Sequence, residues 1–550
     1  MRTHPDRMLA VAVGSIAVSH LAWRLPGGDE LFRDVGFRVG NGDRVALVGA
    51  NGVGKSTLLK LITGDLVASE GTISVDGELG VMHQLVGTAD HPATDVRELL
   101  VSIAPRRLRE AAARMSVAES RLADDPMAYA DALAAWGDAG GYDLEITWDE
   151  CVSRAVGKSF DSLASRPLRT FSGGEQKRLA LEALLRSEFD ILVLDEPDNF
   201  LDVPAKRWLE AQLNDTRKTV LFISHDRELL AATATRIVTV EAWGAWTHGG
   251  SFADYADAKT RHDDRREHDR SLYDDERSRL EDYVKLMRER AKISEGFAPK
   301  LKAAETKLRH FVEKNDRPPE VRDQRIDVRL RGARTGKRAV ICERLEITGL
   351  TDPFDVELWY GERVAVLGGN GVGKSHFLRL LDEVSNTTSA APSDPTSRPV
   401  EFDGVCRLGA GVVAGLFHQT HEHPEWAGHT LVDILYSHDV VLGPAMGMLR
   451  RYELHGCAQQ TFETLSGGQQ ARFQILLLEL SGATLLLLDE PTDNLDLMSA
   501  EALEAGLAQF DGTVVAVTHD RWFLRGFDRY VVFGDDCAVT DHSSLPAAWE

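Results

Sequence analysis

The residues best suited to chemistry lie in two glycine-rich loops with identical spacing. Gly49 and Gly368 each begin a run of glycine, four further residues, glycine, lysine and serine. Glycines let successive backbone N–H groups face a phosphate, the lysine supplies positive charge, and the serine hydroxyl can ligate Mg²⁺. Each loop follows a predicted buried strand and precedes an apolar helix. The spacing therefore predicts two binding sites for the phosphates of a nucleotide.

Acidic pairs with matching positions follow in the two halves of the chain. Asp195 and Asp489 each end a four-residue apolar run, which is a suitable place for a carboxylate that holds Mg²⁺. Glu196 and Glu490 come next and are suited to polarising the water that attacks the terminal phosphate. A single acidic pair at a strand end is often only a solvated turn, but the paired phosphate loops favour a catalytic role.

Two histidines close a further apolar run in each half. His225 stands in Ser-His-Asp-Arg and His519 in Thr-His-Asp-Arg. A neutral imidazole can hydrogen-bond both phosphate and water, so each histidine is predicted to contact the terminal phosphate. A lone histidine is more often structural; the repeated context favours function. We call His225 and His519 the switch histidines.

Each half also contains a Ser-Gly-Gly turn that opens an amphipathic helix. These turns are Ser172–Glu175 and Ser466–Gln469. A helix N-terminus binds phosphate, yet each half already has a phosphate loop. The Ser-Gly-Gly turn of each half would have a use if it bound a nucleotide held by the other half. The two halves are therefore predicted to close head-to-tail over two ATP molecules.

The order of these motifs shows that the chain contains an internal repeat. Four segments recur in the same order: Arg44–Ile62 as Arg363–Leu381, Phe171–Leu185 as Leu465–Glu479, Ile191–Asp202 as Leu485–Asp496, and Leu221–Arg227 as Val515–Arg521. Apolar, β-branched runs indicate buried parallel strands between helices. We therefore expect two α/β domains, residues 1–255 and 339–550, joined by a linker, residues 256–338. Residues 105–141 are helical in pattern and form either a protruding helical arm or a packed helical lid. Residues 385–399 are rich in Ser, Thr and Pro and are expected to form a solvated loop.

Composition limits the classes of protein to which the chain can belong. It has 550 residues, a formal net charge of −23 and no apolar run of about 18 residues that would span a bilayer. Its five cysteines include no Cys-x-x-Cys pair, which argues against a zinc ribbon, an iron–sulfur cluster or a disulfide framework. No signal peptide is recognisable. A cytoplasmic protein is expected.

The linker differs in charge from the rest of the chain. Residues 257–338 hold 24 Lys and Arg against 18 Asp and Glu, and residues 285–310 hold eight basic against three acidic. Helix propensity and apolar spacing predict an antiparallel pair of helices over 257–293 and 299–315 with a turn at 294–299. A basic cluster is usually a solvated face, but on an acidic body it favours attraction to nucleic-acid phosphates.

The motif order resembles that of the ATP-binding cassette (ABC) ATPases over nearly the whole chain. Gln84 and Gln419 supply the glutamine expected between the phosphate loop and the Ser-Gly-Gly turn. The tandem arrangement, the arm and the charged linker resemble the ABC-F group of ribosome-associated ATPases. The implied fold is α/β, with two tandem ABC-type P-loop ATPase domains joined by a long antiparallel helical hairpin.

The resemblance implies two composite sites that bind ATP and Mg²⁺. The residues expected to be catalytic are Glu196, Glu490, His225 and His519. Those expected to hold Mg²⁺ are Ser56, Gln84 and Asp195 in one site and Ser375, Gln419 and Asp489 in the other. ATP would be bound by Gly49, Asn51, Gly52, Gly54, Lys55, Ser56, Thr57 and Gln84 with Ser466, Gly467 and Gly468 opposite, and by Gly368, Asn370, Gly371, Gly373, Lys374, Ser375, His376 and Gln419 with Ser172, Gly173 and Gly174 opposite. Trp23 either stacks on adenine or belongs to the core.

Some positions depart from the family pattern, and two of them lie close to the predicted sites. Phe200 stands where the usual Thr-Asn-His-Leu-Asp segment has a polar histidine, and His376 stands where a threonine usually follows the Mg²⁺-binding serine. Asp202 and Asp496, which the resemblance implies signal between the sites, are present. Neither change removes a catalytic group, so two hydrolysis-competent sites are predicted.

The resemblance implies a ribosome-binding ATPase, with the hairpin reaching P-site transfer RNA and ribosomal RNA. The chain would act as a monomer whose halves pair with each other. Its output would be antibiotic resistance by ribosome protection or relief of stalled translation, although the short turn at 294–298 argues for an indirect effect on a bound drug. The alternatives are the ATP-binding subunit of a drug exporter with separate membrane proteins, or a DNA-repair ATPase. The hairpin has no evident use in gripping membrane subunits, and a DNA-repair ATPase would need zinc modules or far longer coiled coils than this sequence predicts.

Overall fold

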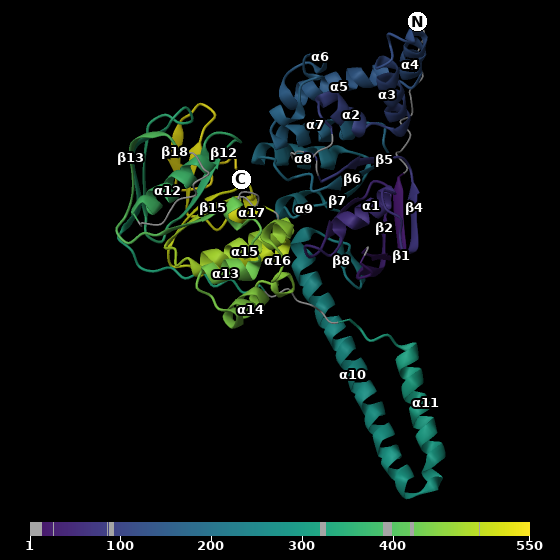
Figure 1. Ribbon diagram of the computed structural model, residues 1–550. Coiled ribbons are helices and arrows are strands. Elements are labelled where there is room, and N and C mark those ends of the chain that lie inside the picture. The colour runs from purple at the N-terminus through teal and green to yellow at the C-terminus, as the bar shows by residue number, and fades with distance from the viewer. Residues whose placement is uncertain are drawn as a thin grey trace. The chain divides into compact units, whose positions relative to one another are not determined.

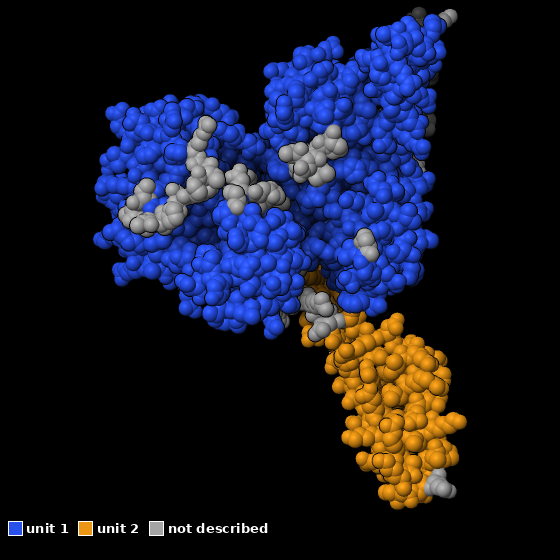
Figure 2. Space-filling model, viewed as in Figure 1, with its two compact units in different colours: residues 1–249, 325–550 blue, residues 250–324 orange. Residues whose placement is uncertain are grey.

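The protein is described by a computed structural model in which two compact units are distinguished (Figures 1 and 2). The larger unit consists of residues 1–249 and 325–550, and the smaller unit of residues 250–324. The described residues are 14–25, 27–84, 86, 93–319, 326–388, 399–418, 423–493 and 495–549. Most of the predicted loop 385–399 lies outside them.

The N-terminal half of the larger unit is built on a six-stranded sheet. Five strands are parallel and the last is antiparallel to its neighbour. Their order is β5 (Leu79–Met82), β6 (Ile191–Asp195), β7 (Thr219–Ile223), β3 (Arg44–Val48), β8 (Arg236–Glu241) and β9 (Gly244–His248). Every residue of β6 and β7 is buried, as expected for central parallel strands covered on both faces.

The C-terminal half repeats this topology strand for strand. Its order is β14 (Ala414–Phe417), β15 (Leu485–Asp489), β16 (Thr513–Val517), β12 (Arg363–Gly368), β17 (Arg529–Phe533) and β18 (Val539–His542). In both halves the strand before the phosphate loop lies in the interior of the sheet, and its carboxyl end meets the carboxyl ends of its parallel neighbours. Motifs that are far apart in the sequence are thereby brought to one edge.

A three-stranded antiparallel sheet packs over each core. The strands are β2 (Glu30–Val39), β1 (Ser15–Arg24) and β4 (Glu70–Asp76) in the first half, and β11 (Phe354–Trp359), β10 (Arg338–Ile347) and β13 (Phe402–Leu408) in the second. Each hydrophobic core is formed by this sheet, the six-stranded sheet and the helix that follows the phosphate loop. The phosphate loops are therefore anchored on rigid, fully packed elements.

The helices that carry functional motifs occupy matching positions in the two halves. They are α1 (Lys55–Thr63) and α12 (Lys374–Thr388), α7 (Gly173–Arg186) and α15 (Gly467–Leu480), α8 (Val203–Asp215) and α16 (Leu497–Ala508), and α9 (Arg227–Thr233) and α17 (Arg521–Leu524). Other helices of the two halves include α2 (Val96–Ser102) and α6 (Phe160–Leu163) in the first and α13 (Leu431–Ser437) and α14 (Leu442–Arg451) in the second.

The helical segment peculiar to the first half consists of α3 (Arg106–Glu119), α4 (Pro126–Asp138) and α5 (Gly141–Val156). Asp125 caps α4 by accepting a hydrogen bond from the Ala128 N–H. The fully buried rings of Trp136 and Trp148 lie 6.3 Å apart and join α4 to α5. The range predicted to form an arm is thus occupied by helices α3 and α4, which pack on each other.

The smaller unit is a pair of helices, α10 (Tyr255–Ile293) and α11 (Ala298–Lys314), which run antiparallel (Figure 1). Its apolar seam consists of Val284, Met287 and Ala304 with partly buried neighbours. The Tyr273 and Phe311 rings stack 5.0 Å apart at the other end of the pair. This hairpin and the two P-loop domains confirm the predicted fold class.

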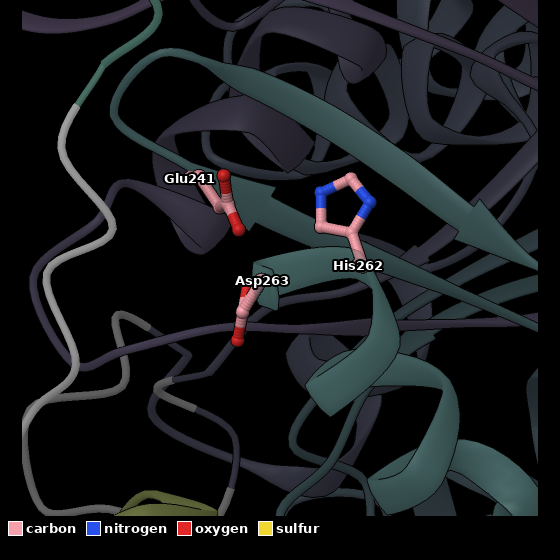
Figure 3. Close-up of side chains that lie close together, drawn as sticks. All are labelled: Glu241, His262 and Asp263. Carbon is pink, nitrogen blue, oxygen red and sulfur yellow. The ribbon is translucent and has the colours of Figure 1, made fainter. Parts of the chain in front are cut away.

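The hairpin exposes most of its charged side chains. His262 and Asp263, which are half-buried, occupy consecutive positions of α10 in Figure 3, which also labels Glu241 at the end of β8 in the larger unit. The Arg288 guanidinium donates to the Glu305 carboxylate at 2.9 Å and links the two helices. None of the helices in the described part of the chain is long and apolar enough to cross a bilayer.

Candidate nucleotide sites

Both phosphate loops have the same backbone shape. Gly49 and Gly368 each have φ of +151°, which L side chains rarely adopt. A Cβ atom on Gly49 would lie 2.5 Å from the Val240 carbonyl oxygen, and one on Gly368 would lie 2.5 Å from the Phe533 carbonyl oxygen. The neighbouring strand therefore leaves room only for glycine at the first position of each loop.

The loop lysines lie against their own loops. Lys55 Nζ donates to the carbonyl oxygens of Gly49 at 2.8 Å and Ala50 at 3.1 Å. Lys374 Nζ makes the equivalent bonds, at 2.8 Å to Gly368 and 2.7 Å to the next residue. Burial lowers the pKa of both lysines, while the carboxylates around them act in the opposite direction. Each ammonium is thus positioned at the concave side of its loop.

A serine hydroxyl and an aspartate lie side by side at each site. Ser56 Oγ is 3.4 Å from Asp195 Oδ1, and Ser375 Oγ is 3.1 Å from Asp489 Oδ1. Burial, followed by the charge of the adjacent glutamate, raises the pKa of each aspartate to about 6. Oxygen atoms of this kind are the ligands that Mg²⁺ prefers.

The two candidate catalytic glutamates share a backbone conformation but differ in their partners. Glu196 has φ of +50° and Glu490 of +47°, a strained region for a residue other than glycine. Glu196 Oε2 accepts hydrogen bonds from Gln84 Nε2 at 3.1 Å and Asn199 Nδ2 at 2.7 Å. Glu490 Oε2 instead accepts from the His519 N–H at 3.0 Å. The repeated sequence therefore folds into two sites that are not equivalent.

The switch histidines are both held neutral. Burial, followed by a nearby lysine charge, lowers the pKa of His225 and of His519 to about 3. Both ring nitrogens of His225 are buried without a hydrogen-bond partner in the described part of the chain. Because buried polar groups are normally hydrogen-bonded, His225 fits a site where a ligand oxygen supplies the missing partner.

The neutral state of His225 leads to a testable expectation. Replacement by glutamine, which remains a neutral donor and acceptor, should retain more ATP hydrolysis than replacement by lysine, which places a charge in a buried site. We expect kcat to fall about tenfold for His225→Gln, which keeps part of the interaction, and about 100-fold or more for His225→Lys, as for the complete loss of one positioned polar group. Steady-state ATP hydrolysis checks this order, and a His225→Lys variant that is as active as His225→Gln would contradict it.

The Ser-Gly-Gly turns are rigid helix N-termini. Ser172 and Glu175 form a reciprocal capping box at the start of α7, and Ser466 and Gln469 form another at the start of α15. The capping boxes use the N–H groups of Ser172 and Glu175 in α7 and those of Ser466 and Gln469 in α15, so the N–H groups of the two glycines in each turn are not used by the box and have the positive end of the helix dipole behind them. Both helices therefore present an anion-binding end.

Several contacts join the two halves of the larger unit at these loops. The Asn51 N–H donates to Asp496 Oδ2 at 2.9 Å, and Asn370 Nδ2 donates to the Phe200 carbonyl oxygen at 3.2 Å. A Cβ atom on Gly174 would lie 3.6 Å from Asn370 Nδ2. One Ser-Gly-Gly turn thus lies next to the opposite phosphate loop. The pairing of residues 466–469 with the first phosphate loop stays a prediction.

Sequence reasoning missed a pair of cross-half ion pairs. Arg227 is paired with Glu504, and Arg521 with Glu210. Both arginines belong to the repeated His-Asp-Arg segments and directly follow the aspartate after each switch histidine. The repetition of arginine in that segment was the signal that could have identified them.

For three of the predicted site residues the structure gives little evidence of a role in nucleotide binding. Trp23 is a partly buried residue of β1 that packs against the core, so its contact with adenine stays a prediction. His376 lies on the first turn of α12, where burial, followed by the charge of Arg379, lowers its pKa. Gln419 lies outside the described residues.

Comparison with known proteins agrees with the geometry of the two sites. The ABC transporter family model matches residues 32–199 and 351–493. An antibiotic resistance protein of Mycobacteroides abscessus is 49% identical over 97% of this chain and 99% of that protein. The energy-dependent translational throttle protein EttA of Haemophilus influenzae is 26% identical over 94% of this chain and 91% of that protein.

The fold also has a counterpart among solved structures. A model of ribosome-bound archaeal Pelota and ABCE1 matches with a TM-score of 0.53 and 18% identity, covering 94% of this chain and 76% of that chain. At this identity the likeness concerns the fold alone. Together with the family match and the relatives, the two P-loop domains show that this chain belongs to the ABC family and, within it, to the ABC-F group of ATPases.

Proposed function

We propose that this protein is a ribosome-binding ATPase that protects the ribosome from an antibiotic. The observation that carries the proposal is the combination of two candidate nucleotide sites with a helical hairpin whose tip, residues 285–310, holds eight basic against three acidic residues on an acidic chain. The similarity to an antibiotic resistance protein over almost the full length of both chains supports the resistance output. The similarity to a translational throttle protein supports the ribosome as the place of action.

The residues of both sites fit MgATP. Ser56 with Asp195, and Ser375 with Asp489, would hold Mg²⁺, which supplies neutralisation of the phosphate charge when bound. The fit is supported by the Gly49 cradle, which a Cβ atom would fill, and by the buried, unpartnered ring nitrogens of His225. Gln84 is exposed and its amide lies on Glu196, so it is available to complete the first site.

In the proposed mechanism the protein's own groups bind the phosphates of ATP, and they orient and activate the attacking water. The backbone N–H groups and lysine of each phosphate loop bind the phosphates. Glu196 and Glu490 orient and polarise the attacking water, and the neutral switch histidines donate a hydrogen bond to the terminal phosphate. The capped turns at Ser172 and Ser466 contact that phosphate from the opposite half. Hydrolysis removes this contact and releases the two halves from each other.

The hairpin is proposed to contact RNA. Lys302, Lys307 and His310 line one side of a shallow open hollow on α11 together with Thr306. The positive side chains of Lys302 and Lys307 on this helix face attract phosphates, while the acidic remainder of the chain is repelled. We assign ribosomal RNA and P-site transfer RNA as the contacted molecules, and a cytoplasmic monomer, with its two halves paired, as the working form.

Co-sedimentation with ribosomes tests the proposal. A Glu196→Gln, Glu490→Gln variant retains nucleotide binding but not water activation, so ATP should keep it in the bound form. We expect this variant to pellet with ribosomes in the presence of ATP and to remain in the supernatant without it. Recovery in the membrane fraction would favour a drug-export ATPase instead, and ATP-independent pelleting would contradict the proposal.

The basic tip of the hairpin is expected to control ribosome affinity. Reversing the charges of Lys292, Lys300 and Lys302 to glutamate should weaken binding at least about tenfold and flatten its salt dependence, because up to three phosphate contacts are lost. A control triple variant, Arg38→Glu, Lys60→Glu and Lys158→Glu, changes the net charge equally at exposed positions of the larger unit. Pelleting over a salt series measures both. Equal weakening by the tip and control variants would assign the effect to net charge alone.

A further inference from the structure

One buried lysine contacts both of the chain segments that carry the switch histidines. Lys206, on α8, is 7% exposed, and its Nζ is 2.9 Å from the Asp226 carboxylate. The same Nζ donates to the backbone carbonyl oxygen of His519 at 3.3 Å. Asp226 directly follows His225 in the chain. A single ammonium group therefore touches the switch segment of both nucleotide sites.

The surroundings of Lys206 are strongly acidic. Burial alone would lower the pKa of Lys206, but Asp226, Asp198 and Asp493 outweigh it and raise the pKa. Burial, followed by the charge of Glu490, raises the pKa of Asp493 to about 8. Asp198 and Asp493 lie in the loops that follow the catalytic glutamates of the two halves. Lys206 is thus a cation that interacts with acidic groups from both sites.

The internal repeat shows that this contact is one-sided. Lys206 is the fourth residue after Asp202, the N-cap of α8, and the matching position four residues after Asp496 is Ala500. Ala500 is buried and cannot donate a hydrogen bond. A buried lysine is costly unless it is paired, so its presence in one half only calls for a role that the pseudo-symmetric fold does not require.

We propose that Lys206 is a positioning residue that couples the two ATP sites by holding the His225–Asp226 segment and the His519 backbone to one ammonium group. A displacement of either switch segment then pulls on the other through two hydrogen bonds to the same atom. Coupling of this kind is reciprocal, so each site responds to the nucleotide state of the other. The role is independent of what the hairpin binds.

The test compares single-site variants with and without Lys206. With Lys206 present, Glu490→Gln alone should reduce total ATP hydrolysis to about a tenth of the wild-type rate or less, because a coupling free energy between the sites would let the blocked site also hold back the intact one. In the Lys206→Met background the same substitution should remove only about half of that background's activity. Glu196→Gln should behave in the same way, and KM for ATP should change less than kcat.

Three further variants make the result decisive. Lys218→Met removes a half-buried lysine that donates to the Ser187 and Phe189 carbonyl oxygens of the same half and touches neither switch segment. It should leave the effect of Glu490→Gln unchanged. Lys206→Arg, which keeps the charge and can bridge two acceptors, should restore coupling at least in part. If the Lys206→Met variant does not fold, Lys206→Gln replaces it in the test. The glutamine side chain is shorter than lysine, so its amide cannot reach both the Asp226 carboxylate and the His519 carbonyl oxygen.

The outcome is judged by one ratio. It is the ATP hydrolysis rate with Glu490→Gln divided by the rate without it, measured in each Lys206 or Lys218 background. A rise of fivefold or more in the Lys206→Met or Lys206→Gln background, with no rise for Lys218→Met, supports the proposal. An unchanged ratio in a folded Lys206 variant overturns it. An equal rise for Lys218→Met also overturns it, because loosening of the fold would then be the cause. Neither result depends on ribosome binding.

Discussion

Replacing both Glu196 and Glu490 by glutamine is expected to lower kcat for ATP hydrolysis by about 10²–10⁴-fold. The substitution is nearly isosteric and leaves the phosphate loops, the loop lysines and the Ser–Asp pairs intact. It removes only the carboxylate charge that polarises the attacking water. Both glutamates have a positive φ held by the fold, so the backbone of each loop should keep its shape. Steady-state phosphate release measures kcat.

A matched control separates this effect from a change in charge. Glu119 ends α3 and Glu313 lies near the end of α11; both are exposed and distant in sequence from the motifs. Their double replacement by glutamine should leave kcat within about twofold, as is usual for surface substitutions. A catalytic-pair variant that keeps more than a third of the wild-type kcat would contradict the assignment of these glutamates as the activating groups.

Replacing Gly49 by alanine is expected to weaken nucleotide binding in the first site. The new Cβ atom would lie 2.5 Å from the Val240 carbonyl oxygen and would force the loop away from the strand. The residue would also be strained at φ of +151°. Because the loop N–H groups must converge on the phosphates, we expect ATP affinity at this site to fall at least about tenfold. Equilibrium binding of a fluorescent ATP analogue measures it.

Gly64 provides the control for Gly49. It has φ of +83° as the C-cap residue of α1, and nothing lies within 4 Å of the position its Cβ would take. Gly64→Ala should therefore cost about 1–2 kcal/mol of stability through backbone strain alone. It should leave ATP affinity at the first site near the wild-type value. A similar loss of affinity in both variants would show that general destabilisation, and not the closeness of Val240, accounts for the effect.

The sequence predicted well those parts of the fold in which a residue type at a given position has a single structural explanation. A glycine in a phosphate loop, a serine that caps a helix and an apolar run that fills a central strand each indicate local structure. Because these features occur twice and in the same order, the two α/β domains could be predicted without ambiguity. The hairpin was predictable for a related reason, since helix propensity and apolar spacing agree over residues 257–293 and 299–315.

The differences between the two sites could not be predicted in the same way. Asn199 binds Glu196, whereas the matching residue of the other half is the acidic Asp493, and Glu490 binds the His519 N–H instead. These choices depend on packing and charge among residues that are distant in sequence. The role of Lys206 could not be predicted from the sequence either. That one half has Lys206 where the other has Ala500 does not indicate that a buried ammonium group contacts both switch segments.

The most direct test of the account is the structure of the Glu196→Gln, Glu490→Gln variant loaded with ATP on the ribosome. The account predicts two nucleotides per chain, with the hydroxyls of Ser172 and Ser466 each about 3 Å from the terminal phosphate held by the opposite half. It also predicts that the basic turn between α10 and α11 contacts RNA. Two halves that stay apart, with each nucleotide touched by only one of them, would contradict it.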